Sequence, residues 1–171
     1  MADGTARNRG AGIAVALGVF LVDQAVKCAV TGPLMLEQRR SIEILPFFNL
    51  TWVENWGVSM GFLTANSDAQ RWLLVGLTAL ISIGVTVWMW REKNRADILA
   101  LGLVLGGAIG NIVDRVRFGH VVDYADLHFG AWRPFLVFNV ADAAITIGVL
   151  ILLIRALLMR EKSDPAENVN A

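Results

Sequence analysis

The sequence predicts an all-α polytopic membrane protein with four membrane-spanning helices, a small antiparallel β-sheet and a short helix outside the membrane. Of its 171 residues 56% are hydrophobic and only 18% are charged, and the mean hydropathy is +0.55. Residues 72–90 contain no charge; as a helix they extend about 28 Å, close to the ~30 Å hydrocarbon core of a bilayer. A soluble protein can bury one such helix, but several in a chain this short indicate a membrane protein.

Four segments have the length and composition of membrane spans: residues 11–30, 72–90, 98–113 and 135–158. Tryptophans at both ends of residues 72–90 fit the aromatic belt of a membrane interface. We expect one membrane-embedded domain, residues 1–171, in which segments 31–71 and 114–134 lie outside the membrane and 159–171 form a solvated tail.

Basic residues predict the orientation of the spans. The segments expected on one side of the membrane are short and rich in basic residues: Arg7, Arg9, Arg91, Lys93, Arg95, Arg155, Arg160 and Lys162. The opposite side carries fewer basic residues in longer segments, so both termini are expected to be cytoplasmic. Arg7 and Arg9 before an apolar run also fit a cleavable signal peptide, but no small-x-small cleavage site follows them.

The first outer segment has strand character. Residues 41–45 alternate, and residues 47–53 are rich in aromatic and β-branched side chains, which predicts a small antiparallel sheet lying against the membrane. A short helical lead-in to the second span is expected after residue 66, with Ser67 or Asp68 as its cap.

Composition excludes several classes of function. Acidic and basic residues balance, which indicates no nucleic-acid partner. The single cysteine, Cys28, excludes a disulfide framework. His120 and His128 lack the spacing of metal ligands, so neither a metal nor another cofactor is expected. Ser59 has no accompanying lysine or histidine motif, so the sequence gives little support to a serine protease mechanism.

Asp142 is the most informative polar residue in a span. An aspartate at the centre of a span costs about 2.5–3.5 kcal/mol, and no basic residue lies within one helical turn of Asp142. We expect it about two turns inside the fourth span, on one face with Asn139. The pair either joins helices by hydrogen bonds or belongs to a functional site.

Other polar and small residues lie in the first and third spans. Asp23 and Lys27 have the i, i+4 spacing of an ion pair, and either neutralise each other or have a functional role. Gly106 and Gly110 are spaced for close approach of helices.

The outer end of the third span is expected to present one polar face. Asn111, Asp114 and Arg115 are spaced i, i+3 and i+4, and a local salt bridge is the expected role of Asp114.

A second carboxylate is expected in a loop that returns to the membrane. Asp123 and Asp126 are both candidates, and either could instead be a solvated loop residue. Two carboxyl groups that lie close together cannot both ionise readily, so the pair shares one proton. The charged member can then activate water while the neutral one polarises a peptide carbonyl, which is aspartic-protease chemistry.

Four segments together resemble bacterial lipoprotein signal peptidase, also called signal peptidase II. They are DQAVK at 23–27, NWGVSMGF at 55–62, GNIVDRVRFGHVVDYADLHF at 110–129 and FNVADAAITIG at 138–148. Each motif is short, but their order and their placement on four spans make the joint match specific. Departures from the family are Val58-Ser59-Met60, where smaller and aromatic residues are usual, and Tyr124, where phenylalanine is common.

The resemblance implies roles for particular residues. Asp123 and Asp142 would form the catalytic dyad, which favours Asp123 over Asp126. Residues that would bind substrate or support the dyad are Asp23, Asn55, Gly57, Asn111, Arg115 and Asn139. Residues with a structural role would be Lys27, Asp114, Gly106 and Gly110.

The resemblance also implies an activity and a location. The family removes signal peptides from diacylglyceryl-modified prolipoproteins, before the lipidated cysteine, at the periplasmic face of the bacterial inner membrane. Membrane lipids and globomycin-type inhibitors would be further partners, and we expect a monomer. The alternatives are a proton-coupled transporter that uses Asp142 and a non-catalytic binder of lipidated precursors.

Overall fold

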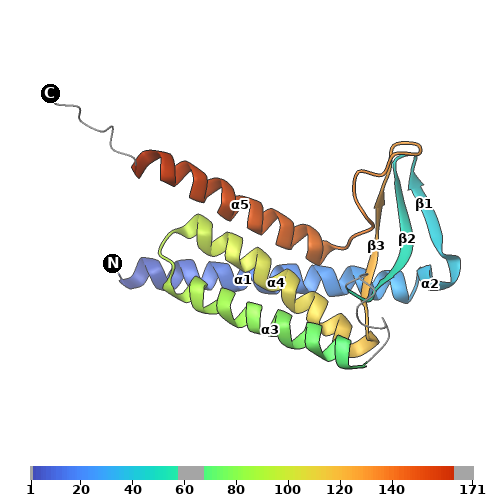
Figure 1. The fold of residues 1–171 in the computed structure, drawn as a ribbon, viewed down its shortest axis with the longest axis horizontal. Helices are drawn as coiled ribbons and strands as arrows, with labels where there is room; N and C mark the ends of the chain where they lie inside the picture. Colours follow the sequence, from blue (N-terminus) through green and yellow to red (C-terminus); the bar gives the residue numbers. More distant parts are fainter. Residues whose placement is uncertain (1, 58–67, 164–171) are drawn as a thin grey trace.

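Four long helices lie side by side, and a three-stranded sheet stands across one end of them (Figure 1). The computed structural model describes residues 2–57 and 68–163. In chain order the elements are α1 (Ala2–Thr31), α2 (Leu36–Arg39), β1 (Ser41–Leu45), β2 (Phe48–Asn55), α3 (Asp68–Arg91), α4 (Arg95–Phe118), β3 (Val121–Leu127) and α5 (Val140–Ser163). The predicted fold class is confirmed, because α1, α3, α4 and α5 are each long and apolar enough to cross a membrane.

Helix α4 lies at the centre of the bundle and packs against α1, α3 and α5. The helices alternate in direction, so α1 begins and α5 ends at the end of the bundle away from the sheet (Figure 1). The outward surfaces are apolar: on α3, for example, Leu73 and Ile83 are each 61% exposed and Leu80 is 66% exposed. Such a surface suits lipid rather than water.

Glycines let α4 approach its neighbours closely. A Cβ atom at Gly106 would collide with the backbone oxygen of Ala16 on α1, and one at Gly107 with the backbone oxygen of Ala141 on α5. Small residues at such positions allow van der Waals packing between helices that gain no hydrophobic energy from leaving lipid.

The sheet is antiparallel, in the order β1-β2-β3. The expected antiparallel pairing of the first outer segment is confirmed by β1 and β2, but the prediction that Asp123 lies in a loop is wrong, because residues 121–127 form β3. Six of the seven residues of β3 are buried. A strand covered on both faces shows no alternation of polar and apolar residues, which is why its sequence resembles an apolar loop.

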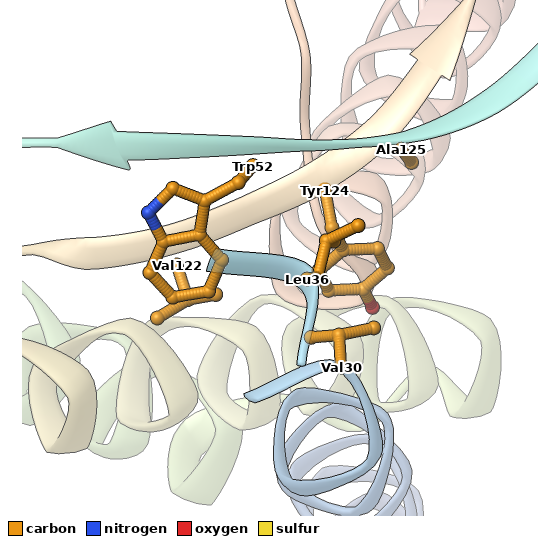
Figure 2. Close-up of a cluster of buried hydrophobic side chains, with 6 residues drawn as sticks. All are labelled: Val30, Leu36, Trp52, Val122, Tyr124 and Ala125. Atoms are coloured by element: carbon orange, nitrogen blue, oxygen red, sulfur yellow. The ribbon is translucent and has the colours of Figure 1, made fainter. Parts of the chain in front are cut away.

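An apolar cluster seats the sheet on the helices (Figure 2). Val30 at the end of α1 and Leu36 of α2 pack against Trp52 of β2, and three residues of β3 complete the cluster: Val122, Tyr124 and Ala125. The cluster fixes β3, and therefore Asp123, at the end of the helix bundle where the sheet lies.

The fourth span begins later than predicted. Residues 135–139 are not helical, because the backbone of Phe138 pairs with Ala125 of β3: Phe138 N–H donates at 3.1 Å, and its carbonyl accepts at 2.8 Å. Asp142 therefore lies in the first turn of α5 and not two turns inside it. Helix α3 begins at Asp68, and the alternative cap Ser67 lies outside the described residues.

Substituting Gly106 tests the close approach of α4 to α1. Gly106→Ala should lower the free energy of unfolding by about 1–3 kcal/mol, because the added methyl group overpacks against α1. Gly84→Ala on α3 is the control, since a Cβ atom there meets nothing within 4 Å. Unfolding in detergent micelles measures both; equal effects at the two positions would contradict the packing argument.

Candidate active site

The first turn of α5 faces the sheet, and side chains from other elements satisfy its backbone N–H groups. A helix leaves its first N–H groups without partners inside the helix. Here three consecutive ones donate to side-chain oxygens: Val140 to the Tyr124 hydroxyl at 3.3 Å, Ala141 to Asp23 Oδ1 at 3.0 Å and Asp142 to Asn139 Oδ1 at 2.9 Å. The start of α5 is thereby fastened to β3 and to α1.

Asn139 links the two candidate catalytic carboxylates. Its Nδ2 donates to Asp123 Oδ1 at 2.6 Å, and its backbone N–H donates to Asp142 Oδ2 at 3.3 Å. Asn139 precedes α5, and its exchange of hydrogen bonds with Asp142 has the form of a capping box. The residue that caps the start of the helix therefore also positions both carboxylates.

Asp123 is held from the sheet as well. It is 2% exposed, and its Oδ2 accepts a hydrogen bond from Asn55 Nδ2 at 2.9 Å. Asn55 Oδ1 in turn accepts the backbone N–H of Gly57 at 3.0 Å, which fixes the orientation of the amide. Gly57 has φ of +98°, a conformation that favours glycine.

The environment of Asp123 favours its protonated form. Burial, followed by the negative charge of Asp142, raises the pKa of Asp123 to about 7. Hydrogen bonds from Asn55 and Asn139 and the charge of Lys27 oppose this rise. A carboxyl group that titrates near neutral pH beside a second carboxylate is suited to acid–base chemistry.

Asn111 of α4 holds Asp142 from the other side. Its Nδ2 donates to Asp142 Oδ1 at 2.8 Å, and its Oδ1 accepts from Lys27 Nζ at 3.2 Å. Because the ammonium group can only donate, it fixes which end of the Asn111 amide faces Asp142.

Lys27 is the centre of a buried ionic cluster. Its Nζ lies 2.8 Å from Asp23 Oδ2 and 2.7 Å from Asp114 Oδ2, and all three side chains are nearly inaccessible. Asp23 and Lys27 thus form the expected ion pair and also join the site. The expected local salt bridge of Asp114 is wrong in its partner: Asp114 pairs with Lys27 across helices.

Two further residues support this cluster. A Cβ atom at Gly110 would lie 2.5 Å from Asp23 Oδ2, so glycine leaves room for the carboxylate. Gln24, which was not predicted to belong to the site, donates to Asp114 Oδ1 at 3.1 Å and to Asp23 Oδ2 at 3.2 Å. The only feature of the sequence that could have indicated this role is the presence of an amide side chain inside a predicted span.

Arg115 brings positive charge to the site. Its side chain is half-buried and interacts electrostatically with Asp142, Asp123 and Asp114. Its Nε has no hydrogen-bond partner among the described residues, while Arg71 Nε donates to its backbone oxygen at 2.7 Å. The guanidinium group therefore acts on these carboxylates through its charge, while its Nε–H is enclosed by protein.

Asp126 is separate from the paired carboxylates. It lies three residues after Asp123 on β3. Side chains separated by an odd number of positions along a strand point to opposite faces of the sheet. It forms a salt bridge with Arg133 Nε at 3.1 Å and accepts from Thr51 Oγ1 at 3.1 Å. These contacts account for its charge.

An apolar cavity of about 250 Å³ opens beside Asp142. Its walls come from the connection between β3 and α5 and from α5 itself: Phe135, Leu136, Phe138, Asp142, Ala143, Thr146 and Ile147. Within residues 2–57 and 68–163 there is no cluster of three metal-ligating side chains. The site consists of two carboxylates, an amide network and an apolar wall.

The fold and the site define an integral membrane protein whose paired carboxylates, held by amides, lie at one end of a four-helix bundle. Residues 15–158 match the family model described as signal peptidase (SPase) II. The chain therefore belongs to the signal peptidase II family, which is a family of aspartic proteases.

Relatives and solved structures agree with this membership. The lipoprotein signal peptidase of Rhizorhabdus wittichii is 63% identical over 171 residues and covers 100% of this chain and 99% of its own. That of Sphingopyxis alaskensis is 54% identical and covers 91% of this chain and 90% of its own. A bacterial membrane enzyme structure at 2.3 Å resolution superposes with a TM-score of 0.75 at 30% identity, covering 94% of this chain and 95% of that one.

Substituting Lys27 tests the ionic cluster. Lys27→Met should lower the free energy of unfolding by about 3–5 kcal/mol, because two buried carboxylates lose their counter-ion. The double variant Lys27→Met/Asp114→Asn should recover part of this loss, since one of the two uncompensated charges is removed. Denaturation in micelles measures both; a double variant less stable than the single one would contradict the cluster.

Proposed function

We propose that this protein removes signal peptides from diacylglyceryl-modified prolipoproteins and that Asp123 and Asp142 activate the attacking water. Cleavage falls before the lipidated cysteine. Family membership supports the activity, and the bridging of both carboxylates by Asn139 is the observation that carries the assignment of the dyad.

The proposed chemistry uses one proton shared between the two carboxyl groups. The charged member takes a proton from water, and the neutral member donates a hydrogen bond to the scissile carbonyl. The amides of Asn55, Asn111 and Asn139 hold the carboxyl oxygens in place, so little reorganisation is needed during the reaction.

The substrate would approach from the membrane. Its acyl chains would remain in lipid and in the apolar cavity beside Asp142, while the backbone around the cleavage site reaches the dyad. Arg115, whose positive charge faces both carboxylates, is placed to interact with a carbonyl group of the substrate. Holding the scissile bond at membrane depth orients it and keeps bulk water away.

The orientation of the protein follows from the same proposal. Both termini would be cytoplasmic and the sheet periplasmic, which places the dyad near the periplasmic face of the bacterial inner membrane. Globomycin-type cyclic peptides would compete with the substrate, and the protein would act as a monomer.

Two other functions make different predictions. A proton-coupled transporter that uses Asp142 would carry protons across liposomes without proteolysis. A non-catalytic binder of lipidated precursors would keep its biological role after substitution of either aspartate. The hydrogen bonds that Asp123 accepts from Asn55 and Asn139 favour an enzyme, because a transporter that uses Asp142 needs no such second carboxylate.

Substituting each aspartate tests the dyad. Asp123→Asn and Asp142→Asn should each reduce kcat by at least about a thousandfold, because neither amide can share the catalytic proton. Asp126→Asn, on the same strand, should keep kcat within about tenfold, since its role lies in a salt bridge. Release of signal peptide from lipidated precursor in micelles measures all three; near-normal turnover by either dyad variant would defeat the assignment.

The pH dependence of kcat/KM provides a second test. Because the pKa of Asp123 is raised to about 7 in the free protein, the pair loses its shared proton as pH rises through that value, and kcat/KM should fall there. Asn55→Leu removes a hydrogen bond that lowers this pKa, so the fall should move to higher pH.

Asn49→Leu, also on β2, is the control for this shift and should leave the profile unchanged. Movement of the fall to lower pH in Asn55→Leu would contradict the proposed electrostatics. Profiles should be compared at lipidated substrate well below KM, so that the values refer to the free enzyme.

A further inference from the structure

Three aromatic side chains are exposed together at the far end of the sheet. They are Phe47, Phe129 and Trp132, and we call them the aromatic tip. Their exposed fractions are 45%, 54% and 65%. The ring centroids of Phe47 and Phe129 lie 6.4 Å apart, and those of Phe129 and Trp132 lie 5.8 Å apart. In water, such a cluster exposes a large apolar area without compensation.

The connection from the aromatic tip to α5 is apolar and exposed as well. Phe135 is 61% exposed and Leu136 is 91% exposed. Both line the cavity that is also lined by Thr146 and Ile147 of α5, and Ile147 is itself 52% exposed. The apolar outer surface of α5 therefore continues along this connection.

Several contacts hold these groups outward. Phe129 and Trp132 exchange backbone hydrogen bonds of 2.8 and 3.2 Å, and His128 N–H donates to Phe47 O at 2.9 Å. Arg133 is anchored to the buried carboxylate of Asp126. The exposed side chains thus belong to an ordered surface.

The position of this surface relative to the helices indicates what covers it. The sheet stands across the bundle, and its far end extends sideways beyond the start of α5 (Figure 1). If the four helices span a bilayer, the space beside α5 is filled by lipid. The tip and the connection then lie over the leaflet at the sheet end of the bundle.

We propose that the aromatic tip and Leu136 insert into the interface of this leaflet and anchor the sheet laterally to the bilayer. Aromatic rings favour the headgroup region, where an apolar body and a polar edge are both accommodated. Leu136 reaches the acyl chains. Because β3 belongs to the same sheet, the anchor sets the depth of Asp123 relative to lipid, whatever reaction the site performs.

Site-directed spin labelling of the full chain in phosphatidylethanolamine/phosphatidylglycerol liposomes tests this anchor. Cys28 is the only cysteine, so Cys28→Ser provides a background for single labels at Trp132→Cys and Leu136→Cys. Leu80→Cys on the outer face of α3 is the lipid reference, and Glu43→Cys on β1 is the aqueous reference. Collisions with oxygen report lipid, and collisions with a water-soluble nickel complex report solvent.

Labels at 132 and 136 should collide several-fold more with oxygen relative to nickel than the label at 43, and approach the ratio at position 80. Ratios equal to that at position 43 would overturn the proposal. Spin–spin broadening that disappears when the protein is diluted in lipid, together with a rise in nickel contact, would assign the surface to a second copy and would also overturn it.

Discussion

The start of α5 is the constraint on which the site depends. Three successive N–H groups of its first turn are bound by Tyr124, Asp23 and Asn139, which come from β3, α1 and the connection before α5. A helix end in a membrane protein cannot leave these groups without partners. The same bonds place Asp142 at the first turn, where the positive end of the helix dipole stabilises a carboxylate and β3 lies alongside.

The buried ionic cluster around Lys27 is the second feature that positions the site. Lys27 faces two carboxylates in a region of low dielectric, where each ion is costly alone and stable only when compensated. Its remaining donor orients Asn111, and Asn111 orients Asp142. Ionic compensation between α1 and α4 is therefore coupled, through one amide, to a carboxylate that α5 carries.

The bundle could be predicted from the sequence because length and hydropathy suffice to identify spans, whereas the geometry of the site depends on contacts between distant segments. Strand β3 was not predicted, since both of its faces are covered. The predicted depth of Asp142 within the fourth span was wrong, because Phe138 pairs with Ala125 of β3 and does not join the helix. Nothing local to Asp114 or Gln24 shows that both contact the cluster around Lys27.

Strand β3 is secured at both ends, which limits how this end of the helix bundle can change shape. Asp114 Oδ2 accepts the backbone N–H of Val122 at 3.2 Å, near the beginning of the strand, and Phe138 binds Ala125 near its end. An opening that keeps these bonds and admits a bulky chain must therefore take place in other parts of the protein, so that Asp123 keeps its position on β3 while they move.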